Sequence, residues 1–188
     1  MALSVENRDL PAETPPGPLT IVVMGVSGVG KTTVARLLAD RLDLPYAEAD
    51  DFHPEANIAK MSAGVPLDDE DRAPWLRAIG AWLGERTEAG TGGVVTCSAL
   101  KHRYRDTLRA ACPGAFFLHL SGGHDLVQDR MSHRTGHFMP PSLLNSQYAA
   151  LEPLGAEELG AVLDVGPSPE ELVEKAAALL RPVNGDLA

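Results

Sequence analysis

The stretch LTIVVMGVSGVGKTTVARLLADRL, residues 19–42, decides the fold. Residues 19–24 form a largely apolar run, which predicts a buried β-strand. Residues 31–42 carry apolar side chains at helical spacing, which predicts a helix with one buried face formed by Val34, Leu37, Leu38 and Leu42. A strand that passes through a glycine-rich turn into a helix is the start of an α/β domain with a parallel sheet.

The turn itself, GVSGVGKT at residues 25–32, matches the pattern G-x-x-x-x-G-K-[ST] and lies between strand and helix, as that pattern requires. Glycine lets the backbone curl so that its N–H groups point at phosphate oxygens, and the helix adds its positive end. We expect Lys31 to reach the outer phosphates, also as a catalytic group, and Thr32 to ligate Mg²⁺. The predicted nucleoside triphosphate site comprises Gly25, Val26, Ser27, Gly28, Val29, Gly30, Lys31, Thr32 and Thr33.

Along the rest of the chain, short apolar runs alternate with helical stretches. Strands are expected at 45–49, 93–97, 115–120 and 160–165, and helices at 69–90, 100–111, 124–134, 141–154 and 168–180. The helix in 69–90 is expected to start near Pro74, and Ser168 with Glu171 predicts a capping box for the last one. The pattern predicts one three-layer, doubly wound, five-stranded parallel sheet over residues 19–182. Residues 1–18, rich in proline, are expected to be a flexible tail.

Composition narrows the class of protein. The chain has 188 residues and a formal net charge of −10 at pH 7, which argues against nucleic-acid binding. It contains two cysteines, too few for a disulfide framework, so buried reduced thiols are expected. No apolar run approaches the length of a membrane span, and the N-terminus lacks the pattern of a signal peptide. We therefore expect a cytoplasmic protein that binds neither nucleic acid nor membrane.

The residues after the strands indicate which class of nucleotide-binding protein this is. The N-K-x-D signature of regulatory GTPases is missing, and residues 93–97 and 115–120 are followed by Ser98 and Ser121 rather than by the acid of a motor or helicase ATPase. Glu48 and Asp50 are the acids that follow a predicted strand beside the loop. This arrangement favours a small kinase with a mobile lid.

The segment EADDFHP, residues 48–54, is predicted to face the outer phosphate. Phosphoryl transfer to a hydroxyl needs a group that takes the departing proton. Asp50 is the candidate base, although it could instead cap the next helix. Glu48, expected on the same strand face, could hold Mg²⁺ through water. His53 is a candidate substrate contact, or a structural residue at a helix start.

Cationic side chains predict a site for an anionic acceptor. Lys101 and Arg105, four residues apart, are expected to share a helix face directly after the strand that ends near Ser98. Their alternative is a solvated basic face. Arg72 is a second candidate partner for a carboxylate, or a surface partner of Asp69 or Asp71. The substrate-binding prediction comprises Asp50, His53, Arg72, Ser98, Lys101, Arg105 and His137.

Residues 131–142 join two predicted helices through Gly136 and the pair Pro140-Pro141. We expect a lid that closes over the nucleotide and excludes water, with an ordinary loop as the alternative. Arg130 is predicted to contact ATP and Arg134 to be catalytic. Trp75 and Trp82 are expected in the core or an interface, without a chemical role.

Several segments together resemble the bacterial-type gluconate kinases, which belong to the group of phosphate-loop proteins that includes nucleoside-monophosphate and shikimate kinases. The matching stretches are MGVSGVGKTT, DDFHPEANIAKMSAGVPLDDEDRAPWL, CSALKHRYRDTLR and GHFMPPSLLNSQYAALE. The resemblance implies transfer of the ATP γ-phosphate to the 6-hydroxyl of D-gluconate, dependence on Mg²⁺, strand order 2-3-1-4-5 and a homodimer. Many members have Asp where this chain has Glu48, which puts the role of that residue in question.

Two rival interpretations stay open. A related kinase could act on another hydroxy acid such as shikimate, or on a nucleotide, although no arginine clamp for a monophosphate is evident. The chain could also be a non-enzymatic ATP-binding switch. The candidate base, the cationic residues and the arginines of the predicted lid favour an enzyme.

Overall fold

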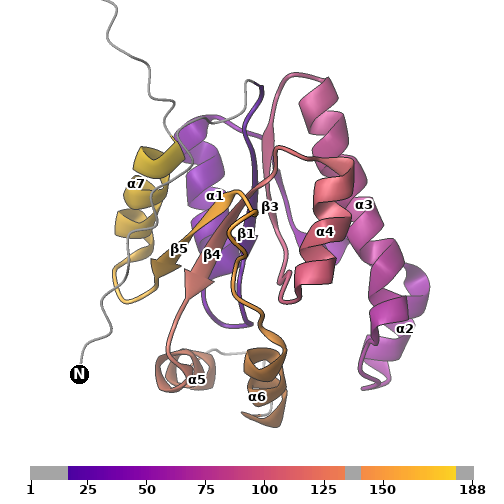
Figure 1. Ribbon diagram of the computed structural model, residues 1–188. Helices are drawn as coiled ribbons and strands as arrows, with labels where there is room; N and C mark the ends of the chain where they lie inside the picture. The colour runs from indigo at the N-terminus through magenta and orange to yellow at the C-terminus, as the bar shows by residue number, and fades with distance from the viewer. Residues whose placement is uncertain (1–16, 134–140, 181–188) are drawn as a thin grey trace, which may run out of the picture.

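A computed structural model of the protein describes residues 17–133 and 141–180. Five parallel strands form one sheet in the order β2-β3-β1-β4-β5 (Figure 1). The strands are β1 (Thr20–Met24), β2 (Tyr46–Ala47), β3 (Gly93–Thr96), β4 (Phe116–Ser121) and β5 (Gly160–Asp164). The predicted α/β class and the predicted strand order 2-3-1-4-5 are confirmed.

Helices cover both faces of the sheet and one of its ends. In Figure 1, α1 (Lys31–Leu42) and α7 (Pro169–Leu180) lie on one face, and α3 (Asp69–Glu88) and α4 (His102–Ala111) lie on the other. The remaining helices, α2 (Glu55–Ser62), α5 (His124–Ser132) and α6 (Pro141–Ala150), lie toward the end to which β4 points. The short 3-10 helix η1 (Ala49–Phe52) follows β2.

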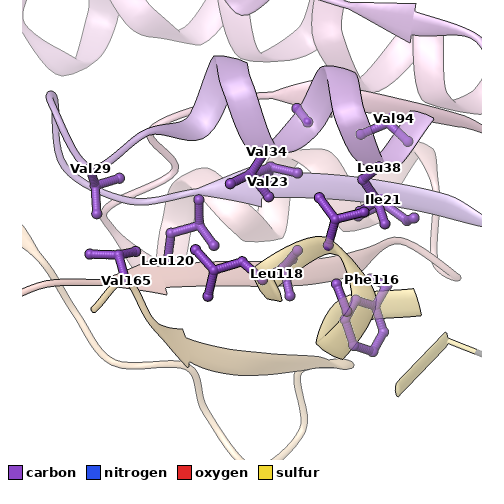
Figure 2. Close-up of a cluster of buried hydrophobic side chains, with 14 of the residues drawn as sticks. Ile21, Val23, Val29, Val34, Leu38, Val94, Phe116, Leu118, Leu120 and Val165 are labelled. Atoms are coloured by element: carbon purple, nitrogen blue, oxygen red, sulfur yellow. The ribbon is translucent and has the colours of Figure 1, made fainter. Parts of the chain in front are cut away.

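The central strand β1 is buried on both sides, which explains its continuous apolar sequence. Ile21 and Val23 pack into a cluster with residues of α1, β4 and α7, part of which is drawn in Figure 2. Val22 and Met24 point to the other face and pack against residues of α3 and α4. Each such side chain contributes about 1.5–3 kcal/mol on burial, so the end of β1 that leads into the glycine loop is held rigidly.

Register brings the ends of the strands together. Val23 pairs with Thr96 of β3 and with Leu118 of β4, so β1, β3 and β4 end at the same edge. Loops at the carboxyl ends of parallel strands are where ligands bind in sheets of this kind. The glycine loop, the residues after Thr96 and those after Ser121 therefore share one region.

Helix α6 ends at Ala150 rather than at residue 154, and two other predicted boundaries are also wrong. Helix α3 begins at Asp69 rather than near Pro74, because Asp68 and Asp71 form a reciprocal capping box: the Asp71 N–H donates to Asp68 Oδ1 (2.8 Å) and the Asp68 N–H to Asp71 Oδ2 (3.1 Å). Strand β2 has two residues instead of the five in 45–49. The capping box predicted for the last helix is confirmed, since the Glu171 N–H donates to Ser168 Oγ and the Ser168 N–H to the Glu171 carboxylate.

Parts of two predicted segments lie outside the described residues. These are residues 1–16 of the predicted tail and residues 134–140 of the predicted lid, which include Arg134 and His137. In the ranges that the structure covers, no helix is both long enough and apolar enough to span a membrane.

Candidate active site

A cleft of about 570 Å³ opens at the carboxyl ends of the strands. Its lining includes the glycine loop with Lys31 and Thr32, and the loop between α2 and α3. The segment of Glu48, Asp50 and His53 also lines it, as does Arg72 from α3. Residues predicted separately for the phosphates and for the acceptor therefore line one cleft.

The glycine loop has the backbone that its sequence predicts. Gly25, Gly28 and Gly30 have φ values of 145°, 82° and 103°, a region that favours glycine. A Cβ at Gly28 would also overlap the side chain of Met131. The loop leads into the N-terminus of α1, and the Lys31 ammonium donates to the Val26 carbonyl oxygen (3.0 Å). This geometry suits the binding of a chain of phosphates.

Gln147 of α6 also lines the cleft and contacts the glycine loop directly. Its Oε1 accepts the Ser27 N–H (2.7 Å) and its Nε2 donates to Ser27 Oγ (3.0 Å). Gln147 was not predicted, because 120 positions separate it from the loop. Its occurrence in the stretch GHFMPPSLLNSQYAALE, which carries the family resemblance, was the available signal.

The Glu48 carboxylate accepts hydrogen bonds from three hydroxyl groups, one of which belongs to Thr32. Thr32 Oγ1 donates to its carboxylate (3.1 Å), Thr96 Oγ1 donates to Oε1 (2.7 Å), and the Tyr46 hydroxyl donates to Oε2. Burial raises the pKa of Tyr46 to about 12, and its hydrogen bond to Glu48 acts in the same direction. Thr96 and Tyr46 were not predicted. The cluster offers the oxygen ligands that Mg²⁺ prefers, so the residues present fit the ion.

Asp50 lies in η1 and is exposed, rather than at the end of a strand on the same face as Glu48. The chain turns away from the sheet after β2, because the Ala49 N–H donates to Thr96 Oγ1 (3.1 Å) and the Ala49 carbonyl accepts from Trp75 Nε1 (2.7 Å). The alternative role of Asp50 as a helix cap is not seen, since Pro54 is the N-cap of α2 and no side chain caps it. Asp50 lines the cleft, which is compatible with its predicted role as base.

His53 is half-buried in the cleft wall and stacks on Trp75, with ring centroids 4.7 Å apart and planes at 6°. Its Nδ1 lies 3.3 Å from Asn57 Nδ2. Burial lowers the pKa of His53; Asp50 opposes this shift and Arg72 reinforces it. Trp75 is a core residue as predicted, 4% exposed, but it also lines the cleft and supports His53, a role that the sequence did not reveal.

Arg72 remains the best-placed cation for a carboxylate. It lines the cleft, with its guanidinium 6.0 Å from the centroid of the Tyr104 ring. The alternative, a surface pair with Asp69 or Asp71, is wrong: Asp69 pairs with Lys101 and Arg103, and Asp71 pairs with Lys60. In the part of the chain that the structure describes, no carboxylate forms an ion pair with Arg72.

Two predicted substrate contacts do not reach the cleft. Arg105 is 0% exposed and pairs with Glu158 (Nε to Oε1, 2.6 Å) while donating to the carbonyl oxygens of Ala99 and Pro153. Lys101 is the N-cap residue of α4 and pairs with Asp69 (3.2 Å). The two side chains do not share a helix face as predicted, because Lys101 lies in extended backbone just before α4. Sequence spacing also does not tell whether a basic side chain faces a buried carboxylate, as Arg105 does.

The two cysteines are buried free thiols, as predicted. Burial raises the pKa of Cys97 to about 12, so the thiol stays protonated at neutral pH. Its neighbour Ser98 lines the cleft, and the substrate contact of Ser98 stays a prediction.

Arg130 of α5 donates through Nη2 to the Val165 carbonyl oxygen (2.7 Å). This bond anchors α5 to the end of β5. Arg130 is not one of the residues that line the cleft, and its predicted contact with ATP stays a prediction. The predicted roles of Arg134 and His137 concern residues outside the described ranges.

Comparison with known proteins gives consistent matches. The family model of shikimate kinase matches residues 27–153. The gluconokinase of Gluconobacter oxydans is 52% identical over 141 residues, which are 75% of this chain and 79% of that protein.

Two crystal structures are similar over most of their length. An unliganded sugar kinase from Janibacter sp. is 51% identical with a TM-score of 0.81, covering 88% of this chain and 96% of its own. A gluconokinase from Sinorhizobium meliloti is 48% identical with a TM-score of 0.76, covering 86% and 90% respectively. The chain therefore belongs to the gluconokinase family of kinases, within the wider group that the shikimate kinase model describes.

Proposed function

We propose that the protein transfers the γ-phosphoryl group of ATP to the 6-hydroxyl of D-gluconate, which yields 6-phospho-D-gluconate and ADP. The observation that carries this proposal is one cleft lined both by a phosphate loop and by Asp50, His53 and Arg72. A sugar acid has a carboxylate at one end and a primary hydroxyl at the other. The cleft offers a cation and a base for these two ends.

In the proposed reaction the Asp50 carboxylate takes the proton of the 6-hydroxyl as that oxygen attacks the γ-phosphorus. The bond from phosphorus to the β–γ bridging oxygen breaks, and ADP leaves with that oxygen. A positioned base of this kind is worth a factor of about 10²–10⁴ in rate. Lys31 and the N–H groups of the glycine loop hold the phosphates and neutralise their charge.

Thr32 and Glu48 are the residues that would hold Mg²⁺, Glu48 through water. Mg²⁺ supplies neutralisation of the phosphate charge when it is bound. Thr96 and Tyr46 fix the Glu48 carboxylate beside Thr32 through their hydroxyl groups. Glutamate is longer than the aspartate that many members of the family have at this position. The hydroxyl groups of Thr96 and Tyr46 hold its carboxylate in place, which supports the proposed role of Glu48 in binding Mg²⁺.

Arg72 is proposed to bind the carboxylate of gluconate. A charge-assisted hydrogen bond of this kind contributes about 1.5–3 kcal/mol. Ser98 and His53 line the same cleft and are proposed to contact the sugar hydroxyls. Arg130, Arg134 and His137 keep their predicted roles in covering the nucleotide and substrate.

A second candidate is phosphorylation of shikimate, favoured by the family model that matches residues 27–153. An assay of ADP release with gluconate, shikimate and nucleoside monophosphates separates the candidates. We expect turnover with gluconate alone. Turnover with shikimate and none with gluconate would overturn the proposal, and ATP binding without turnover would indicate a switch.

The family resemblance also supports a homodimer in the cytoplasm. Light scattering coupled to size-exclusion chromatography would measure the mass of the assembly, and a mass of one chain at micromolar concentration would contradict the dimer.

A further inference from the structure

The side chain that contacts His53 fixes where the imidazole carries its proton. Asn57 of α2 is 3% exposed and lies between His53 and the first turn of α3. Its Nδ2 donates to the Asp71 carbonyl oxygen (2.8 Å) and also lies 3.3 Å from His53 Nδ1.

The contact with Asp71 determines the orientation of the Asn57 amide. A carbonyl oxygen only accepts hydrogen bonds, so the NH₂ group of Asn57, and not its oxygen, faces it. The second hydrogen of that NH₂ group is then available to His53 Nδ1. A nitrogen that faces a donor has to present its lone pair, so Nδ1 of His53 carries no proton.

An imidazole with an unprotonated Nδ1 is neutral and carries its proton on Nε2. The charged groups that face His53 are Asp50 of η1 and Arg72 of α3. The lowered pKa of His53, caused first by burial, agrees with a neutral ring. Among the described residues none accepts a hydrogen bond from Nε2.

We propose that Asn57 is a positioning residue that holds His53 as the neutral tautomer with its proton on Nε2, and that this N–H donates to an oxygen of the sugar acid. The second half rests on the proposed function, because it assigns the substrate to the cleft that His53 lines. The consequence for the reaction is direct. A ring with its proton on Nε2 and Nδ1 occupied by Asn57 cannot accept the proton of the acceptor hydroxyl, which leaves that task to Asp50.

The first test measures the tautomer in ligand-free protein and needs no turnover. Long-range ¹H–¹⁵N correlation spectra distinguish a proton-bearing ring nitrogen from an unprotonated one, and His53→Gln identifies the signals of His53. We expect protonated Nε2 and unprotonated Nδ1 at a pH about one unit above the ordinary histidine pKa of about 6.5. A proton on Nδ1, or an averaged mixture of both tautomers, would overturn the proposal.

The second test adds gluconate to the wild-type protein. The Nε2 signal of His53 is expected to move on saturation, while an unmoved signal would refute the contact with substrate. Calorimetry that detects no binding of gluconate would instead refute the proposed function, and the tautomer spectrum would still decide the role of Asn57.

The third test replaces the donor by an acceptor. In Asn57→Asp a carboxylate faces Nδ1, so the proton of the neutral ring is expected to move to Nδ1 and the pKa of His53 to rise. At a pH about two units above 6.5, the KM for gluconate is expected to rise by about 3- to 10-fold, equivalent to one hydrogen bond, with the KM for ATP unchanged.

Asn145→Asp is the matched control, because Asn145 Oδ1 contacts His124 Nε2 on α5 instead. It should leave the spectrum of His53 and the KM for gluconate unchanged. If Asn57→Asp moves the proton to Nδ1 but leaves the KM for gluconate at the wild-type value, the His53 N–H does not bind the sugar acid. If the variant does not fold, the first two tests still decide both halves.

Discussion

Replacing Arg105 by methionine is expected to destabilise the fold without weakening substrate binding. The side chains of Arg105 and Glu158 are both 0% exposed, and the guanidinium also donates to backbone carbonyls of Ala99, Leu100 and Pro153. Arg105→Met keeps an unbranched apolar side chain in place of the arginine stem but leaves the Glu158 carboxylate buried without its cation.

Removal of one partner from a buried ion pair costs about 3–5 kcal/mol. For a domain of this size each kcal/mol lowers Tm by about 2–4 °C, so Tm should fall by about 6–20 °C. Equilibrium unfolding in urea, followed by circular dichroism, measures the free energy directly. The KM for gluconate of the folded variant should equal that of the wild type.

The pH dependence of the free energy of unfolding gives an independent check on the pair of Arg105 and Glu158. Burial alone would raise the pKa of Glu158, but hydrogen bonds from Arg105 and from the Gly155 N–H outweigh it, so the pKa lies below its ordinary value. The stabilisation is therefore present above the ordinary glutamate pKa of about 4.3 and is lost as pH falls through the lowered pKa. The difference between wild type and Arg105→Met should accordingly shrink in acid.

Two further variants test whether the loss of stability comes from the unpaired buried charge of Glu158. Arg103→Met, on the same helix, removes a guanidinium that is 59% exposed and pairs with Asp69, and should cost less than about 1 kcal/mol. Combining Arg105→Met with Glu158→Leu replaces both charges by apolar groups and should restore most of the lost stability. A cost of less than about 1 kcal/mol, together with a strongly raised KM for gluconate, would contradict the buried structural role of Arg105. That result would support the sequence-based assignment of Arg105 to the substrate.

Three other variants test the cleft. Asp50→Asn should lower kcat by about 10² or more with little change in ATP affinity; an unchanged kcat in the ADP-release assay would show that Asp50 is not the base. Gln147→Ala removes two hydrogen bonds to Ser27 and should raise the KM for ATP by about 5- to 10-fold, whereas a change confined to the KM for gluconate would contradict its role at the loop. Gly28→Ala forces a Cβ into the side chain of Met131 at a positive φ and should abolish ATP binding in calorimetry, and wild-type affinity would show that the loop adapts.

The fold was predictable because its signals are local. The apolar run of β1, the glycine loop and the amphipathic α1 follow one another within residues 19–42, and each requires the same βα geometry. The start of α3 was misplaced because Pro74 was given more weight than the four consecutive acids at 68–71, which provide the actual cap. Strand β2 was overestimated because its end is set by Thr96 and Trp75, which are distant in sequence.

The lining of the cleft was predictable in part, where residue type and spacing indicate a chemical role. Glycines and a lysine at fixed spacing indicate phosphate binding. Asp50, His53 and Arg72, which were predicted to contact the substrate, line the same cleft as this loop. Arg105 was misassigned because its partner Glu158 lies 53 positions away in a segment without a motif. Gln147 was missed because its contact with Ser27, 120 positions away, depends on tertiary packing.

The central claim is that phosphate moves from ATP to the primary hydroxyl of a sugar acid held in this cleft. Phosphorus NMR of the reaction with gluconate labelled with ¹³C at carbon 6 tests it most directly, because coupling between phosphorus and that carbon identifies the acceptor oxygen. We expect a single phosphomonoester whose phosphorus couples to carbon 6, formed in step with ADP. Phosphate on another oxygen, or no phosphorylated gluconate while shikimate is consumed, would contradict it.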